Sequence, residues 1–187
     1  MKTILLQPGR YYHIFNCAKN GDPLFKNEED YKFFLKLYKT HVAPVADTYA
    51  YCLLGDHLHL LVRIHPDAEG SLYKPFALLF NSYSKGYNKQ HGSEGRIFRF
   101  KLKRMEIRRE TYLLDMIRYI NQNARRHGVT EDLARYRFSS YRATISGTSE
   151  LVNRDELIRH FGLGDSLIRN LNAPVDEKSV KMLMMEA

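Results

Sequence analysis

Polar and apolar positions alternate most clearly over residues 54–62, which read Leu-Gly-Asp-His-Leu-His-Leu-Leu-Val. A Gly-Asp pair, typical of a turn, precedes an apolar run whose only strongly polar residues are His57 and His59. Because strand side chains alternate between faces, both imidazoles lie on one face, and Leu58 and Leu60 lie on the other. Two imidazoles on one strand are a candidate site for a divalent cation. The alternative is a pair of ordinary histidines on a polar sheet face.

The pattern elsewhere predicts three more strands and two helices between them. Asn27 is a candidate N-cap, and the acidic residues that follow it favour the start of a helix that ends before Pro44. Strands are expected at 11–17, 48–54 and 57–64 and around 97–98, with helices at 28–42 and 72–87. The order strand, helix, strand, strand, helix, strand predicts a ferredoxin-like α+β fold, an antiparallel sheet with helices on one face.

A third helix is predicted over residues 111–127, with Gly128 after its end. One narrow arc of this helix is apolar and should face the sheet, namely Leu113, Ile117, Ile120 and Ala124. A second row lies beside that arc: Tyr112, Met116, Tyr119 and Asn123. Tyr119 and Asn123 are therefore expected at the boundary between core and solvent. Packing, with the hydroxyl in water, is the usual role of such a tyrosine.

The C-terminal part is expected to be helical and short. Residues 130–133 suggest a capped short helix, 138–141 a compact turn, and 153–156 a capping box that opens a helix ending at Phe161. A methionine-rich tail follows at 182–185. We expect a main domain over residues 1–145 and a helical appendage over 146–187 that is not an independent domain.

Composition narrows the class of protein. The chain has 187 residues, enough for one good core, and its 44% hydrophobic content is that of a globular protein. Its net charge of +8 attracts polyanions, of which nucleic acid is the commonest. Cys17 and Cys52 are expected to be reduced packing residues. We find no signal peptide or run of eighteen apolar residues, so we expect a cytoplasmic protein without a membrane partner.

Positive charge is concentrated between Arg96 and Arg109, where seven Lys or Arg residues occur with one Glu. A lysine-rich edge strand that resists aggregation has such a composition. The interpretation we favour is a groove that follows a nucleic-acid backbone. The candidate nucleic-acid-binding residues are Arg96, Arg99, Lys101, Lys103, Arg104 and Arg108.

Four motifs in this order resemble the HUH single-tyrosine transposases, specifically the branch of REP-associated tyrosine transposases. They are Asp-His-Leu-His-Leu-Leu-Val at 56–62, Gly-Arg-Ile-Phe at 95–98, Tyr-Ile-Asn-Gln-Asn at 119–123 and Ser-Ser-Tyr at 139–141. The resemblance implies an enzyme that cleaves and rejoins single-stranded or hairpin DNA through a 5′-phosphotyrosine. It implies that His57 and His59 bind Mg²⁺ or Mn²⁺, that Asn123 completes the metal site, and that Tyr119 is the nucleophile.

Two departures from the family pattern stand close to these residues. Leu-Gly-Asp at 54–56 replaces the usual Met-Pro-Asn before the histidines, and Ala-Arg-Arg-His at 124–127 replaces Pro-Val and a small residue, which lets the helix continue. His13 is a weaker candidate near the site. Asp56 could orient a histidine or simply form the turn, and the turn is the interpretation we favour. Two imidazoles favour Mn²⁺ over Mg²⁺ in vitro.

Other functions are compatible with the same residues. A domesticated hairpin-binding protein would recognise such DNA without cutting it. A ferredoxin-like RNA-binding module would stack bases on sheet-face aromatics such as Tyr12 or Phe98. A two-histidine metal hydrolase would release free ends without a covalent intermediate. The resemblance allows either a monomer with a complete site or a homodimer that exchanges the tyrosine.

Overall fold

The computed structural model describes residues 5–19, 21–148, 151–176 and 180. Within them, four strands form one antiparallel sheet in the order β2-β3-β1-β4. The strands are β1 (Tyr11–Cys17), β2 (Ala46–Leu53), β3 (His57–Ile64) and β4 (Lys103–Ile107), and the helices between them are α1 (Glu28–His41) and α2 (Tyr73–His91). The predicted ferredoxin-like α+β fold is confirmed.

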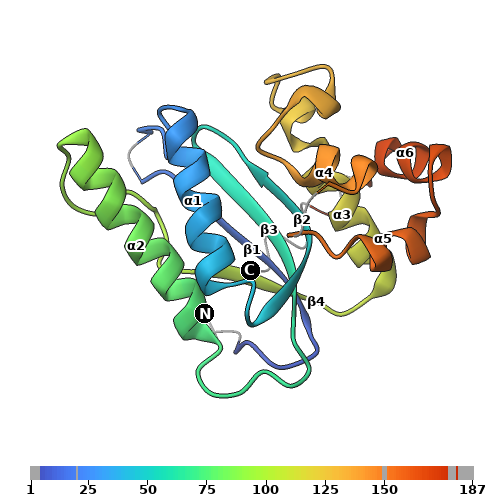
Figure 1. Ribbon diagram of the computed structural model, residues 1–187, viewed down its shortest axis with the longest axis horizontal. Helices are drawn as coiled ribbons and strands as arrows, with labels where there is room; N and C mark the ends of the chain where they lie inside the picture. Colours follow the sequence, from blue (N-terminus) through green and yellow to red (C-terminus); the bar gives the residue numbers. More distant parts are fainter. Residues whose placement is uncertain (1–4, 20, 149–150, 177–179, 181–187) are drawn as a thin grey trace.

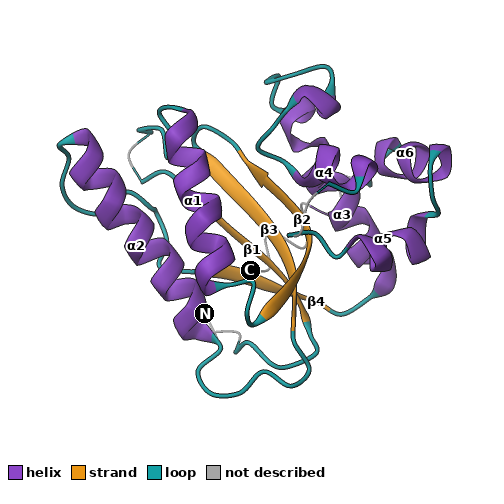
Figure 2. Cartoon of the chain, viewed as in Figure 1, coloured by secondary structure: helices purple, strands orange, loops and turns teal. Residues whose placement is uncertain are grey.

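Helices cover both faces of the sheet, and Figure 1 shows α1 and α2 on one side and α3 (Glu110–Arg126) with the later helices on the other. The hydroxyls of Tyr38 in α1 and Thr48 in β2 lie 2.6 Å apart, which fixes the α1 face. Thr48 pairs with Val62, so Leu58 and Leu60 face the same side. The intervening histidines of β3 therefore face α3. Figure 2 shows the sheet between the two sets of helices.

Local sequence explains where the helices begin and end. Asn27 and Asp30 form a reciprocal capping box at the start of α1, as the acidic first turn predicts. Gly92 ends α2 in the left-handed conformation, with φ of 60°. With no proline after Asn123, α3 continues to Arg126, and Gly128 follows with φ of 67°. The predicted helices are confirmed to within a few residues.

The predicted position of the fourth strand is wrong. Residues 97–98 contribute only an isolated bridge between Phe98 and Ala18, and the strand itself begins at Lys103. The reason is Asn16, whose side-chain amide donates to the carbonyl of Phe100 at 2.9 Å and whose amide oxygen accepts from the Phe100 N–H at 3.1 Å. This side chain takes the place of a backbone partner, so the chain leaves the ladder at Phe100 and pairs with β1 again only at Lys103.

The C-terminal helices differ from the prediction in two places. Residues 138–141 are no isolated turn, because Ser139 is the N-cap of α4 (Ser140–Ser146), and α6 (Asp165–Asn172) was not predicted. The expected short helix is a 3₁₀ turn, η1 (Leu133–Arg135), and α5 (Arg154–Phe161) follows its predicted cap. The methionine-rich tail lies outside the described residues.

The segment after residue 150 packs on the main sheet and on α3. Val152 forms a parallel bridge with Thr48 of β2. The buried amide of Gln122 in α3 donates to the carbonyls of Leu171 and Ala173 at 2.8 and 2.9 Å. These contacts connect the expected appendage to the helix that carries Tyr119.

Two expectations from composition can be compared with the described residues. Cys17 and Cys52 are both free thiols, as predicted. In the described ranges, no helix combines the length and the apolar character needed to cross a membrane.

Replacing Asn16 tests the link between β1 and the basic segment. Asn16 is 2% exposed, so Asn16→Ala leaves the N–H and carbonyl of Phe100 without their partner. We expect the free energy of unfolding to fall by about 1–3 kcal/mol in urea denaturation. Asn88→Ala is the control, because its exposed bond to the carbonyl of Gly95 can be replaced by water. Equal losses in both variants would contradict this account.

Candidate functional site

Three histidines from two adjacent strands meet on the sheet face that α3 covers. In the β1–β3 ladder, Phe15 pairs with His59 and Cys17 pairs with His57. His13, two residues before Phe15, shares this face, and its Nε2 lies 2.9 Å from Nδ1 of His59. His13 is fully buried and His59 is 6% exposed. The hydrogen bond fixes the plane of the His59 ring.

This bond leaves one ring nitrogen of His59, Nε2, without a partner in the pair. For Nε2 to offer a lone pair to a cation, Nδ1 must carry the proton and donate it to His13. His13 then carries its own proton on Nδ1, which is buried and has no hydrogen-bond partner among the described residues. The reverse arrangement, in which His13 donates, avoids that buried donor but protonates His59 at Nε2. The two tautomers of the pair therefore differ in their capacity to bind a cation.

Asp56 orients the other strand histidine. Its Oδ1 lies 2.7 Å from Nδ1 of His57, so the turn residue also accepts a hydrogen bond from the imidazole. This corrects our preference for a turn role alone. Partial burial is the largest single influence and acts to raise the pKa of Asp56, but the hydrogen bond and charge of His57, a backbone hydrogen bond and His127 together outweigh it, so the pKa is lowered. The carboxylate thus holds His57 with Nε2 directed away from Asp56, the arrangement found behind metal-bound histidines.

Tyr119 reaches the site from α3. Its half-buried ring lies edge-on to His59, with centroids 5.9 Å apart and an angle of 83° between the rings. The guanidinium of Arg126 lies 5.4 Å from the centroid of the same tyrosine ring. The structure therefore brings together the strand histidines and the tyrosine that the sequence singled out, with a cation beside the ring.

Asn123 is buried completely, which contradicts its expected place at the boundary with solvent. It lies one helical turn after Tyr119, on the α3 face toward the sheet. Neither its amide nitrogen nor its amide oxygen has a hydrogen-bond partner among the described residues. Such a group costs stability unless a ligand or water meets it, so an orphaned amide one turn from Tyr119 is an informative feature.

His127 is a site residue that the sequence analysis missed. Its ring centroid lies 4.5 Å from that of His57, at an angle of 60°. Tyr119, Asn123 and His127 follow one another at intervals of four, so one face of α3 and its C-cap passes over both strand histidines. That spacing is visible in the sequence and could have identified His127.

The buried imidazoles are electrically neutral at physiological pH. Burial lowers the pKa of His13 to about 3. Burial, together with the neighbouring histidines, holds the pKa of His59 well below its ordinary value, and the pKa of His127 is lowered first by burial and then by His57. Cys52 lies beside His59 on the neighbouring strand β2 and is an inert thiol, because burial raises its pKa to about 12.

The donor set suits a cation only if the amide takes part. Among the described residues, no three His, Cys, Asp or Glu side chains are arranged to hold a metal ion. The donors that remain are Nε2 of His57, Nε2 of His59 and the orphaned amide oxygen of Asn123. Two imidazoles and one oxygen are compatible with Mn²⁺ or Mg²⁺ that keeps further water ligands.

The candidate nucleic-acid-binding residues occupy three environments. Lys103 pairs with Phe15 in the ladder and so shares the histidine face. Arg104 faces the opposite side, is 9% exposed and lies 5.7 Å from the ring of Tyr73. Burial lowers its pKa. The others are exposed, namely Arg96, Arg99, Lys101 and Arg108.

The two aromatic residues proposed for RNA stacking lie in the core. Tyr12 is fully buried and Phe98 is 3% exposed. Tyr12 donates to the carbonyl of Leu5 at 3.2 Å, and Phe98 packs edge-on to Phe80 with ring centroids 4.9 Å apart. Neither ring presents a face to a base, so these two residues do not support the RNA-binding interpretation.

Comparison with solved structures finds a similar fold in a REP-associated tyrosine transposase bound to a REP hairpin. The TM-score is 0.60 at 14% sequence identity, over 81% of this chain and 88% of that one. No family model matches the sequence, and no curated protein matches it. At this identity the likeness establishes the fold.

The buried His13 makes stability depend on pH. In the unfolded chain it titrates near pH 6.5, whereas its folded pKa is about 3. As pH falls from about 6.5 toward 3, the unfolded state binds a proton that the folded state does not bind, so the free energy of unfolding falls. We expect His13→Phe, in chelator, to reduce that slope by about 1.4 kcal/mol per pH unit.

Urea denaturation between about pH 4.5 and pH 6.5 measures the slope. Ile14→Val is the matched control, because it removes a buried methyl group from the next residue, costs about 0.5–1.5 kcal/mol and takes away no titrating group. The control should run parallel to the unmodified protein. Parallel curves for His13→Phe as well would contradict the prediction.

Proposed function

We propose that this protein is a DNA transposase-type enzyme that cleaves and rejoins single-stranded or hairpin DNA through a 5′-phosphotyrosine on Tyr119. The observation that carries the proposal is the edge-on contact between Tyr119 and His59, the inner histidine of the His57–His59 pair. A nucleophile beside neutral metal-binding groups is what phosphodiester attack by a phenol requires. The likeness in fold to a tyrosine transposase bound to a hairpin agrees with it.

In the proposed reaction, the hydroxyl oxygen of Tyr119 attacks the phosphorus of a phosphodiester. A bond forms between that oxygen and phosphorus, and the bond from phosphorus to the 3′-oxygen breaks. The phenol loses its proton, and the departing 3′-oxygen gains one. The products are a 5′-phosphotyrosine and a free 3′-hydroxyl. Attack by another 3′-hydroxyl reverses the step, so bond energy is conserved and no nucleotide cofactor is consumed.

A divalent cation is part of the proposal, held by Nε2 of His57, Nε2 of His59 and the amide oxygen of Asn123. When bound, it would offset the negative charge of the scissile phosphate and favour loss of the phenol proton, since the pKa of a free tyrosine is about 10. The residues around it serve to position these donors. Asp56 and His13 fix the two rings, and α3 holds Asn123 one turn from Tyr119.

The basic segment would hold the DNA strand beside this site. Phe98 bridges to Ala18, the N–H of Arg99 donates to the carbonyl of Cys17 at 2.8 Å, and Lys103 pairs with Phe15. The segment over residues 96–103 therefore runs along β1, which itself lies against the histidine strand. A row of cations at that distance would neutralise phosphates next to the scissile one.

A domesticated hairpin-binding protein is the second candidate function. It would use the same basic segment and the same fold, and would leave Tyr119 without a chemical role. A homodimer, for which the resemblance allows exchange of the tyrosine, is not needed for the contact between Tyr119 and His59, because both lie in one chain.

Labelled hairpin DNA distinguishes the two functions. With Mn²⁺ or Mg²⁺, a strand labelled at its 3′ end should become attached to the protein and migrate slowly until protease is added. A strand labelled at its 5′ end should give a shorter fragment with a free 3′-hydroxyl. Tyr119→Phe should reduce both products at least about a thousandfold, because the nucleophile is lost, and leave hairpin affinity nearly unchanged.

Tyr112→Phe is the matched control, a half-buried tyrosine two turns earlier on the same helix. It should retain activity, whereas His57→Ala and chelator should abolish it. Cleavage that survives Tyr119→Phe would indicate a metal hydrolase. Binding without cleavage of any hairpin would indicate the domesticated binder.

Removal of the Asp56 carboxylate should weaken the binding of a divalent cation to the protein alone, in the absence of DNA. Asp56→Ala frees the His57 ring to rotate and to carry its proton on Nε2, so Mn²⁺ affinity should fall about 10-fold. The Mn²⁺ affinity is measured by a titration in which electron paramagnetic resonance reports the concentration of free Mn²⁺. Asp67→Ala, at an exposed position after β3, is the control. Equal affinity in both variants would exclude Asp56 as an orienting residue.

A further inference from the structure

Two consecutive arginines lie in the last turn of α3, and their side chains have different surroundings. Nε of Arg125 donates to the carbonyl of Glu131 at 3.1 Å, and a terminal nitrogen donates to the amide oxygen of Asn172 at 3.3 Å. The guanidinium of Arg126 lies over the ring of Tyr119, 5.4 Å from its centroid. Arg125 therefore connects α3 to the segments that follow it, whereas Arg126 faces the proposed nucleophile.

The geometry of α3 explains how Arg126 reaches Tyr119. Arg126 follows Tyr119 by seven positions. This spacing is about two helical turns, so both side chains leave the same face of α3. The Cα–Cβ bonds of a helix tilt toward its N-terminus, so a long side chain at the end of α3 extends back toward Tyr119. The sequence permits this contact because no proline follows Asn123 and α3 continues through Arg126.

A guanidinium is suited to both stages of a transfer of phosphate to tyrosine. Its flat face stacks on an aromatic ring, and its N–H groups can donate in pairs to phosphate oxygens. It stays charged at any pH at which the protein is folded, so neither contact requires an exchange of protons. In the proposed reaction, phosphorus becomes bonded to the hydroxyl oxygen of the ring that Arg126 faces. The reaction therefore brings a phosphate to the side of this guanidinium.

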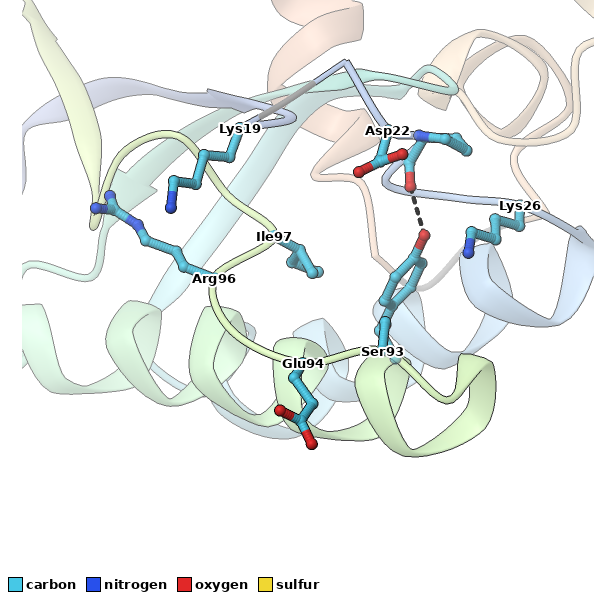
Figure 3. Close-up of a pocket in the computed structure, with 9 residues that line it drawn as sticks. Lys19, Asp22, Lys26, Ser93, Glu94, Arg96 and Ile97 are labelled. Atoms are coloured by element: carbon cyan, nitrogen blue, oxygen red, sulfur yellow. Dashed lines mark hydrogen bonds between the residues drawn. The ribbon is translucent and has the colours of Figure 1, made fainter.

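Another contact between a cation and a tyrosine, away from the histidine site, provides a comparison. It lies at a pocket of about 240 Å³, which Figure 3 shows and whose lining includes three cations and two carboxylates, namely Lys19, Lys26, Arg96, Asp22 and Glu94. The carboxylates repel a phosphate that the cations attract. Nζ of Lys26 lies 5.4 Å from the ring centroid of Tyr87, the same distance as between Arg126 and Tyr119. Lys26 is therefore a matched reference for Arg126.

We propose that Arg126 is a further catalytic residue of the transfer to Tyr119. In the free protein, its guanidinium holds the ring of Tyr119 beside His59. As the bond from the hydroxyl oxygen to phosphorus forms, N–H groups of Arg126 donate to the non-bridging oxygens of that phosphate, which carry its negative charge. Arg126 keeps its own protons, so the bonds that form and break are those of the proposed reaction. This inference rests on the proposed function, because it adds a second group to the reaction at Tyr119.

The test measures the rate of covalent product formation with the full chain, Mn²⁺ and labelled hairpin DNA, at protein concentrations in excess of the DNA. The dependence on protein concentration separates DNA affinity from the maximal rate. Arg126→Met keeps an apolar side chain of similar length and removes the charge. We expect its maximal rate to fall about 100-fold, while the protein concentration for half-maximal rate changes by less than about threefold. An interaction made only in the transition state has this signature.

Further variants separate this role from general charge and from folding. Lys26→Met removes an equal charge and an equal ring contact, and its maximal rate should stay that of the unmodified protein. Arg125→Met removes two structural hydrogen bonds, so it should lower the free energy of unfolding in urea without lowering the maximal rate. Arg126→Lys keeps a point charge without the flat donor group and should retain part of the rate. Free guanidinium ion, below its denaturing range, should partly restore Arg126→Ala and leave Tyr119→Phe inactive.

A measurement without metal or DNA tests the ring contact itself. In protein with ¹³C-labelled tyrosine rings, the magnetic resonance signal that is absent from Tyr119→Phe belongs to Tyr119. This signal should shift in Arg126→Met, because a charge over the ring changes its electron distribution. It should stay in place in Lys26→Met, in which the signal of Tyr87 should shift instead. A Tyr119 signal that is the same in Arg126→Met and in the unmodified protein would contradict the contact.

The outcomes distinguish this inference from the proposed function. If the unmodified protein forms the covalent product and Arg126→Met forms it at the same maximal rate, Arg126 is excluded as a catalytic residue and the proposed function stands. A loss that appears only as weaker DNA affinity would make Arg126 one more DNA-binding cation and would also overturn the inference. If Arg126→Met does not fold, Arg126→Lys and the restoration of Arg126→Ala by guanidinium ion decide. If the unmodified protein forms no covalent product, both proposals are excluded.

Discussion

The register of β1 against β3 is the constraint on which the site depends. Phe15 opposite His59 and Cys17 opposite His57 place the imidazoles on the α3 face. A shift by one residue would turn both histidines into the face that α1 and α2 cover and expose Leu58 and Leu60 to α3. Four apolar side chains at alternate positions of β3 resist such a shift, because each is at most 1% exposed. They are Leu58, Leu60, Val62 and Ile64. The apolar core therefore sets the chemistry of the opposite face.

Burial gives these histidines a property that exposed ones lack. The bond between His13 and His59 lies where neither ring can readily gain a second proton, so one proton is shared across the 2.9 Å contact. A neutral pair can accept a divalent cation without first losing a proton to solvent, whereas His⁺ cannot. The cost is a buried nitrogen of His13 and an orphaned amide of Asn123. Buried polar groups without a hydrogen-bond partner are rare in folded proteins and concentrate at functional sites.

Local sequence patterns were sufficient to predict the helices and strands, whereas the details of the site depend on contacts between residues far apart in the sequence. The alternation over 54–62, the cap at Asn27 and the apolar arc of α3 were sufficient for the ferredoxin-like order and for the shared face of His57 and His59. The pairing of His13 with His59 joins residues 46 apart, and that of Asn16 with Phe100 joins residues 84 apart. No pattern within a helix or strand encodes such contacts, so the strand at 97–98 and the exposure of Asn123 were predicted wrongly.

One short strand connects the two halves of the proposed function. The odd positions of β1 lie on the histidine face: His13 supports His59, and the ring centroid of Phe15 lies 5.2 Å from the ammonium group of Lys103. The next even position, Asn16, fixes the basic segment by bonding both backbone groups of Phe100. Because β1 holds both the histidine site and the basic segment, the cations that would bind a DNA strand stay at a constant distance from the groups that would cleave it. Positioning of that kind is what a reaction between a bound phosphate and a fixed nucleophile needs.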